Sequence, residues 1–409
     1  MTNPPLNGYE AMASGAVMSP FSRLRALLAD VPTDEAQVID LTLGEPRETM
    51  PPFIADKIRE AEALFARYPP IRGSDALRGA IAAWLDRRFG LDGAGVIDPA
   101  REVLPTLGSR EGLYFAALPA VGRRTFDGQP AILLCNPFYQ AYIGAALATG
   151  SEPVYLNATE ATGHLPDLDE IAGDEALLRR TAALYLCSPA NPQGAVASPA
   201  YIRRALDLAR DHDFMLFFDE CYSEIYSESP PTGALEVAQA TRERYRNLVV
   251  FNSLSKRSNL PGLRSGFCAG DGDFLEILGE VRNLVGPTMA GPIQHASAFA
   301  WADETHVAAN REAYRRKYDI CDAVLGDRFG YRRPAGGFFL WLDVAQFGGG
   351  VQAAVTIWKR CGVRVIPGAY LAQTGRDGNN PGANYVRVAL VADPEAIRTA
   401  LERVVSLVA

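Results

Sequence analysis

The sequence has few residues of the kind that build cross-linked or metal-held folds. Its six cysteines include no C-x-x-C pair, and several lie in apolar runs, where a free cysteine behaves as a small hydrophobic residue. Its four histidines form no H-E-x-x-H or similar metal-binding motif. We therefore expect neither a disulfide framework nor a metal site, and we expect the chain to work in a reducing compartment.

Long apolar runs and clusters of basic residues are absent too. No window approaches about 18 consecutive apolar residues, and the opening MTNPPLNGYE has no basic region followed by an apolar stretch. We therefore expect no membrane span and no secretory signal. The net charge is −8, and the 40 basic residues are spread along the chain, which argues against nucleic acid or an anionic membrane as a partner. Together these absences predict a cytoplasmic protein.

What the sequence has is enough apolar residues for a large core. Of its 409 residues, 48% are hydrophobic and 22% are charged, as in ordinary globular proteins. From about residue 102 to residue 256, apolar strand-like runs alternate with helical segments, which predicts an α/β fold with a mostly parallel sheet flanked by helices. Beyond residue 290 the pattern changes to that of a smaller α+β unit. We predict an N-terminal arm and joining segment over 1–45, a large domain over 46–290 and a small domain over 291–409.

The most informative stretch is residues 251–266, FNSLSKRSNLPGLRSG, at the end of an apolar run. Ligands of open α/β sheets gather at the carboxyl ends of strands, and this end carries Ser253, Ser255 and Lys256, followed by Arg264. A lysine with a lowered pKa acts as an amine nucleophile, and hydroxyls beside an arginine suit a phosphate. The combination points to pyridoxal 5′-phosphate held as a Schiff base. Taken alone, S-x-S-K fits a surface loop better, so the neighbouring motifs decide.

Other predicted strands also end in polar residues that suit this cofactor. Ser109 and Arg110 begin a helix, whose free N–H groups favour a phosphate. Asn191 lies in the turn S-P-A-N-P-Q-G and can donate to a ring oxygen. Asp219 closes an apolar strand, where a carboxylate needs a partner such as a pyridinium nitrogen. The first two motifs, taken singly, fit ordinary turns as well.

In their order and spacing, the motifs resemble those of the class I/II aminotransferases of fold type I. The resemblance extends from about residue 21 to the end of the chain. Its landmarks are G-E-P (44–46), Y-P…G…L-R (68–78), G-S-R-E (108–111), P-F-Y-x-x-Y (137–142), N-P-x-G (191–194), D-E-x-Y (219–222), S-x-S-K…R (253–264), G-G-F-F (336–339) and Arg387. The resemblance implies a large domain with a seven-stranded, mostly parallel sheet and a small domain that joins both ends of the chain.

The resemblance also implies a role for each site residue. Lys256 would carry pyridoxal 5′-phosphate and move the proton of the substrate, Asp219 would pair with the pyridine nitrogen, and Asn191 and Tyr222 would hold the ring oxygen. Arg387, Asn191 and the backbone N–H of Gly44 would bind the substrate. The remaining cofactor contacts would come from Ser109, Arg110, Tyr139, Ser253, Ser255 and Arg264, with Tyr68 supplied by the partner subunit of a homodimer.

Two details narrow the substrate. The stretch P-F-S-R-L-R-A-L-L (20–28) and the residues Arg257 and Asn259 look most like the succinyldiaminopimelate aminotransferases of bacterial lysine synthesis. This likeness implies amino transfer from N-succinyl-L,L-2,6-diaminopimelate to 2-oxoglutarate. Arg47 follows G-E-P where many relatives carry Asp, so Arg47 and Arg23 become candidates for the distal carboxylates. An exposed loop arginine explains Arg47 equally well.

Other functions fit the same motifs. One ring and one lysine also serve aminotransferases for aspartate, N-acetylated or aromatic amino acids, and β-lyases. A ligand-sensing domain of a transcription regulator would need a basic DNA-binding module ahead of the fold, and G-E-P already lies at 44–46. The sequence therefore predicts an aminotransferase and leaves open the exact amino donor, the distal contacts and the extent of domain closure.

Overall fold

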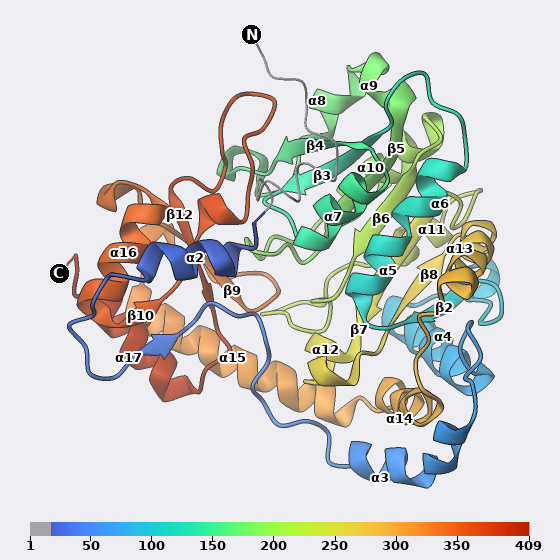
Figure 1. The fold of residues 1–409 in the computed structure, drawn as a ribbon, viewed down its shortest axis with the longest axis horizontal. Helices are drawn as coiled ribbons and strands as arrows, with labels where there is room; N and C mark the ends of the chain where they lie inside the picture. Colours follow the sequence, from blue (N-terminus) through green and yellow to red (C-terminus); the bar gives the residue numbers. More distant parts are fainter. Residues whose placement is uncertain (1–17, 409) are drawn as a thin grey trace.

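A seven-stranded sheet forms the centre of the larger part of the molecule in the computed structural model, which describes residues 18–408 (Figure 1). In space the strands follow the order β2-β8-β7-β6-β5-β3-β4, and all neighbouring pairs are parallel except the two that involve β8. Their bounds are β2 Val103–Thr106, β3 Ala131–Asn136, β4 Glu152–Asn157, β5 Thr181–Cys187, β6 Met215–Asp219, β7 Leu248–Ser253 and β8 Gly266–Gly270. The predicted α/β fold with a mostly parallel seven-stranded sheet is confirmed.

The central strands consist of continuous apolar sequence because both of their faces are covered. Every residue of β3, β5, β6 and β7 is buried, so their side chains do not alternate between apolar and polar. These strands run parallel, and their carboxyl ends therefore lie at one edge of the sheet. That edge brings together polar residues that end the strands, among them Asp219 of β6 and Ser253 of β7.

Helices flank this sheet (Figure 1). The start of α4 shows how the sequence sets their ends: Ser74 is the N-cap, and its side chain accepts a hydrogen bond from the N–H of Leu77 (3.3 Å). Gly90 ends the same helix in the left-handed region. The helices of this part are α3 Ile54–Glu60, α4 Asp75–Phe89, α5 Ser109–Phe115, α6 Ala117–Gly122, α7 Gln140–Ala148, α8 Leu168–Ala172, α9 Glu175–Arg180, α10 Pro199–Asp211, α11 Ala234–Gln239, α12 Leu254–Arg257, α13 Gly272–Val285 and α14 Gly291–Ala302.

The two ends of the described chain meet in the smaller part of the molecule (Figure 1). Its antiparallel sheet has the order β11-β12-β9, and β1 pairs in parallel with β10, so the N-terminal segment returns to this part. The elements are α2 Pro20–Leu28, β1 Ile39–Asp40, α15 Thr305–Leu325, β9 Phe339–Asp343, α16 Gly350–Cys361, β10 Val363–Arg364, β11 Ile366–Pro367, β12 Tyr385–Ala389 and α17 Pro394–Val405. The domain boundaries at residues 45 and 290 stay predictions, and residues 1–17 of the predicted arm lie outside the described residues.

The apolar spacing of the sequence predicts one helix over 53–68 and one helical region over 291–325, and both are divided in the structure. The helix expected over 53–68 ends at Glu60 and continues as the 3₁₀ segment Glu62–Ala66. The helical region expected over 291–325 consists of α14 and α15, which separate at Asp303, where Oδ2 accepts the backbone N–H of His306 (3.1 Å) at the start of α15. The apolar spacing runs on through both breaks, so periodicity alone did not reveal them.

Three further observations concern membranes, metal ions and cysteines. Within residues 18–408, no helix is both long and apolar enough to cross a membrane. The same range brings together no group of three or more His, Cys, Asp and Glu side chains that would hold a metal ion. The six cysteines are all buried and free.

Candidate active site

A cavity of about 580 Å³ opens beside the carboxyl edge of the large sheet. Every predicted site residue except Tyr68 and Arg47 lines it. These lining residues are Gly44, Ser109, Arg110, Tyr139, Asn191, Asp219, Tyr222, Ser253, Ser255, Lys256, Arg264 and Arg387. The chain thus brings into one cavity residues that are more than 300 positions apart in sequence, such as Gly44 and Arg387.

Lys256 is held in the cavity by the short helix α12, which directly follows β7. Ser253 caps this helix: its Oγ accepts the N–H of Ser255 (3.0 Å). The Nζ atom of Lys256 donates a hydrogen bond to the carbonyl oxygen of Gly44. Burial lowers the pKa of Lys256 to about 8, and the Arg387 guanidinium contributes to the decrease. A fraction of this amine is therefore unprotonated near neutral pH and able to act as a nucleophile.

Asp219 is a buried carboxylate at the end of β6. The Oη of Tyr142 donates to its Oδ2 (2.8 Å), and the N–H of Cys221 donates to its Oδ1 (3.1 Å). Burial raises the pKa of Asp219, and these hydrogen bonds oppose the increase. Among residues 18–408 no basic side chain forms an ion pair with it. A cation placed beside this carboxylate would supply the partner that a buried charge needs.

Arg387 is a buried cation on β12, only 4% exposed. It donates to Oδ1 of Asn191 (3.2 Å) and to the carbonyl oxygen of Thr42 (2.7 Å), and it lies over the ring of Phe339 at 4.3 Å. Its Nε has no hydrogen-bond partner among the described residues, and burial lowers its pKa to about 10. A carboxylate in the cavity would satisfy this guanidinium. Gly44 lies beside the same ring, and a Cβ there would come within 2.6 Å of Phe339 Cζ.

Hydroxyl and guanidinium donors that suit a phosphate come from the turn before α5 and the segment after α12. Gly108 has a φ of +77°, and a Cβ there would lie 2.5 Å from Nη2 of Arg264, so glycine is needed for this close approach. Arg264 is fixed by hydrogen bonds from Nη1 to the carbonyl oxygen of Pro261 (2.9 Å) and from Nη2 to that of Leu107 (3.0 Å). The cavity lining also includes Ser109, next to this glycine.

Aromatic side chains form the walls of the cavity. Tyr222 is buried and packs edge-on against Phe338 (5.3 Å between ring centres) and Phe339 (5.7 Å). The Oη of Tyr139 accepts a hydrogen bond from Nε of Arg110 (2.5 Å), so the two side chains hold each other. A flat ring would therefore find aromatic surface and a hydroxyl in this cavity.

Tyr68, expected at the partner's cofactor, and the two arginines considered for the distal carboxylates do not line the cavity. Tyr68 is fully exposed. Arg47 is exposed in the loop after Pro46, and the Arg23 guanidinium lies over the ring of Tyr370 at 3.8 Å. The outer wall, as we call it here, consists of five other lining residues from outside the large sheet, which are Pro20, Phe21, Leu43, Glu45 and Leu371.

Sequence reasoning missed Tyr142, although its spacing contained a signal. In P-F-Y-x-x-Y, Tyr139 and Tyr142 are three residues apart at the start of α7, and such residues share a helix face. Tyr139 was expected at the ring, so Tyr142 was a candidate for the same neighbourhood. It is fully buried and reaches the carboxylate of Asp219.

The donor set fits pyridoxal 5′-phosphate. A buried carboxylate without a cation suits a protonated ring nitrogen, and the glycine that leaves space for Arg264 suits a phosphate. Lys256 supplies an amine of lowered pKa in the same cavity. The residues present therefore provide for the nitrogen, the phosphate and the aldehyde carbon of this molecule.

Comparison with known proteins finds aminotransferases, in agreement with the residues of this cavity. The model of the family "aminotransferase class I and II" matches residues 36–404. Among curated relatives, an LL-diaminopimelate aminotransferase of Desulforudis audaxviator is 31% identical, covering 94% of this chain and 93% of the relative. The 4-dedimethylamino-4-oxo-anhydrotetracycline transaminase OxyQ of Streptomyces rimosus is 34% identical, with 90% and 92% covered.

Solved structures agree with these sequences. An aminotransferase of Neisseria meningitidis superposes with a TM-score of 0.89 at 38% identity, over 95% of this chain and 97% of its own. The aminotransferase AspB of Helicobacter pylori has a TM-score of 0.85 at 34% identity, over 100% and 99%. The likeness therefore extends over nearly the whole chain in both comparisons.

Proposed function

Because the chain belongs to the class I and II aminotransferase family, we propose that it uses pyridoxal 5′-phosphate to transfer an amino group from N-succinyl-L,L-2,6-diaminopimelate to 2-oxoglutarate. The observation that carries the chemistry is the meeting of three groups in one cavity. These are an amine with a pKa of about 8, a buried carboxylate without a cation and a buried guanidinium without an anion. The first provides the nucleophile and base, and the other two suit a ring nitrogen and a substrate carboxylate.

The mechanism assigns a task to each of these side chains. When bound, pyridoxal 5′-phosphate supplies an electron sink that makes the α-hydrogen of an amino acid acidic. Arg387 would orient the donor by its α-carboxylate, together with Asn191 and the N–H of Gly44. Nζ of Lys256 would then take the α-proton as a general base and return it in the second half of the transfer. Asp219 would hold the proton of the ring nitrogen.

The other predicted contacts complete the cofactor site. Tyr222 and Asn191 would hold the ring oxygen, and Tyr139 would cover the ring face. The phosphate would be bound by Ser109, Arg110, Ser253, Ser255 and Arg264 of one subunit and by Tyr68 of the partner. The full exposure of Tyr68 supports this last assignment, because the side chain is free to reach another chain.

The distal end of the donor needs binding groups in addition to those that hold its α-carboxylate. An N-succinylated donor ends in two carboxylates and an amide, so it needs cationic or neutral donors beyond Arg387. Arg47 stays a proposal for this role: it is exposed, two residues after the lining residue Glu45. The apolar residues of the outer wall would pack against the methylene groups.

A second candidate donor is L,L-diaminopimelate without the succinyl group. It is favoured by the names of curated relatives such as that of Desulforudis audaxviator. Glu45 favours it too, since this exposed carboxylate of the outer wall would attract a free distal ammonium and repel a succinyl carboxylate. Glu45 should therefore favour the free diamine and disfavour the succinylated donor.

The test is a comparison of kcat/KM for both diaminopimelate donors, aspartate and an aromatic amino acid, each with 2-oxoglutarate. We expect the succinylated donor to have the highest value. Glu45→Gln should raise kcat/KM for the succinylated donor and lower it for the free diamine, each by about 2- to 10-fold. A higher value for the free diamine would establish the second candidate, and a higher value for aspartate or the aromatic amino acid would contradict both.

A further inference from the structure

The helix that carries Lys256 has too few residues to keep its own shape. α12 has four residues, and a single helical turn is not stable without neighbours. The last carbonyl groups of a helix also have no partner within it. The direction of the Lys256 side chain therefore depends on whatever holds the end of α12.

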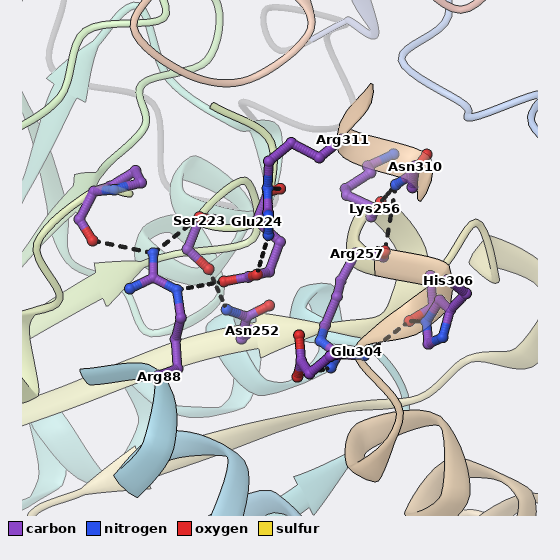
Figure 2. A network of polar contacts seen from close by, with 12 residues as sticks. Arg88, Ser223, Glu224, Asn252, Lys256, Arg257, Glu304, His306, Asn310 and Arg311 are labelled. Atoms are coloured by element: carbon purple, nitrogen blue, oxygen red, sulfur yellow. Dashed lines mark hydrogen bonds and ion pairs between the residues drawn. The ribbon is translucent and has the colours of Figure 1, made fainter. Parts of the chain in front are cut away.

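The long helix α15 holds this end (Figure 2). Nδ2 of Asn310 donates to the carbonyl oxygens of Lys256 (3.0 Å) and Arg257 (3.3 Å), which are the last two residues of α12. One turn earlier, Nε2 of His306 lies 2.8 Å from Oγ of Ser258, the residue that caps α12. Asn310 and Ser258 are both buried. Asn310 thus satisfies two carbonyl groups at the end of α12, and His306 contacts the side chain of its C-cap residue.

The side chain of Arg257 forms a second set of contacts, with the end of α14 and with Glu304. Its side chain is fully buried, with Nη1 donating to the carbonyl oxygen of Ala300 (2.7 Å) and Nη2 to Oε1 of Glu304 (2.7 Å). Ala300 belongs to the last turn of α14, where a cation is favoured by the helix dipole. The residue after Lys256 is therefore anchored through its side chain as well as its carbonyl group.

We propose that Arg257, His306 and Asn310, the lysine clamp, are positioning residues that fix the direction from which Nζ of Lys256 enters the cavity. All three lie within the described range, and none is among the residues that line the cavity. They act on the reaction only through the backbone of Lys256. The inference rests on the proposed function, since it concerns the amine that this function uses.

The clamp should affect the rate of proton transfer more than the binding of the donor. Arg387 and Asn191 bind the donor from β12 and the turn after β5, which the clamp does not touch. A displacement of about 1 Å at a reacting group costs up to about 100-fold in rate. The pKa of the Lys256 amine depends on the distances from Nζ to nearby ionisable groups. A change in this pKa therefore indicates that Nζ has moved. The ionisable groups that act on it are Cys221, Arg387, Glu45, Arg264 and Asp219.

The test uses the Asn310→Ala holoenzyme. We expect kcat to fall by about 10- to 100-fold and the KM of the donor to change by less than about 3-fold. The pH midpoint of the visible absorbance of the bound cofactor should shift, because Nζ moves relative to the five neighbouring groups. Ser258→Ala removes the hydroxyl that contacts both Nε2 of His306 and Nη1 of Arg257, so it should also shift this midpoint, and it serves if Asn310→Ala does not fold.

The matched control is Asn247→Ala. Asn247 is also buried and donates from Nδ2 to a backbone carbonyl, that of Phe214 (2.9 Å), but it precedes the opposite end of β7, about 20 Å from Lys256. Its φ of 63° adds strain to the alanine variant, which should lose at least as much thermal stability. It should keep the wild-type kcat and absorbance midpoint.

Two outcomes would overturn different claims. If a folded clamp variant loses thermal stability as the control does and keeps kcat and the midpoint, the clamp is structural only and the inference is wrong. If Lys256→Ala retains transamination, the proposed function fails instead. Loss of activity in Lys256→Ala together with unchanged clamp variants contradicts only the positioning role.

Discussion

Burial shifts the two key ionisable residues of the site in opposite directions. It lowers the pKa of Lys256 and raises that of Asp219, because in each case it disfavours the charged form. Hydrogen bonds from Tyr142 and Cys221 oppose the effect at Asp219 only. Burial therefore makes the neutral form of Lys256 more accessible, while the hydrogen bonds stabilise the ionised form of Asp219.

The titration of Lys256 gives a direct prediction. A lysine with a pKa of about 8 is about half neutral at pH 8, whereas one at the ordinary value of about 10.4 is less than about 1% neutral. In cofactor-free protein, acetylation of Lys256 by an anhydride should therefore rise with pH up to about 8 and level off above about 9. Mass spectrometry of the labelled peptide measures this, with N-acetyl-lysine amide as the reference amine. A midpoint near 10 would contradict the assignment.

Individual residues were predictable from sequence where they end a strand. Lys256 and Asp219 follow apolar runs directly, and parallel strands bring such ends to one edge. Tyr142 and Asn310 lie on helices, and the direction in which a helical side chain points depends on how the helix packs. Arg47 shows the reverse: it lies two residues from a lining residue, yet it is exposed and does not line the cavity.

At the scale of elements, the turn between β2 and α5 requires glycine at position 108. Gly108→Ala would place a methyl group 2.5 Å from Nη2 of Arg264 at a φ of +77°. We expect the affinity for pyridoxal 5′-phosphate to fall by about 10-fold or more, because the methyl group would displace the guanidinium that we propose binds the phosphate. Titration of the apo-protein with the cofactor, followed by absorbance, measures this.

The control for this prediction is the same substitution in an open position. Gly79→Ala lies in α4 with no atom within 4 Å of the new methyl group. Alanine is the better helix former, so this variant should gain about 0.5–1 kcal/mol in free energy of unfolding and keep its cofactor affinity. Equal affinities for the two variants would show that the space at Gly108 is not needed.

Element boundaries could be predicted where a cap marks them. Ser74 before α4 and Asp393 before α17 have side chains that accept N–H groups of the first turn, and serine and aspartate are residue types that favour the start of a helix. The break between α14 and α15 has a similar residue, Asp303, but it lies within a continuous helical pattern. A capping residue inside a continuous helical pattern cannot be recognised as a helix start from the sequence alone, because the break depends on how the helices pack.

At the scale of the whole molecule, Tyr68 implies a second chain. It is fully exposed, and its neighbours Leu64 and Phe65 are also exposed, which is unusual for large apolar side chains so close together. We propose that this segment meets the partner subunit and that Tyr68 contributes to the partner's phosphate site.

Mixing two inactive variants tests the shared site. A Tyr68→Phe chain and a Lys256→Ala chain would form hybrid dimers in which one of the two sites has both native residues. After random exchange we expect up to about a quarter of the wild-type activity, because half of the dimers are hybrids. Differently tagged chains would confirm the exchange. Exchange without recovery would mean that each chain builds its phosphate site alone.

The global architecture followed from sequence more readily than these contacts between chains. Alternating strands and helices predicted the parallel sheet, and the return of the N-terminal segment to the smaller part was predicted as well. Contacts between chains leave no periodic pattern, so for the proposed subunit contact only the resemblance of Y-P (68–69) to a family motif gave a signal.

The origin of the outer wall has a consequence for evolution. Asp219 and Lys256 come from the carboxyl edge of the large sheet, whereas the outer wall comes from residues 20, 21, 43, 45 and 371. Mutations in those segments can alter the accepted donor without disturbing the reacting groups, so new specificities can arise while the catalytic apparatus is inherited unchanged. Relatives about 30% identical to this chain include a diaminopimelate enzyme and one named for a tetracycline precursor, as such divergence would produce.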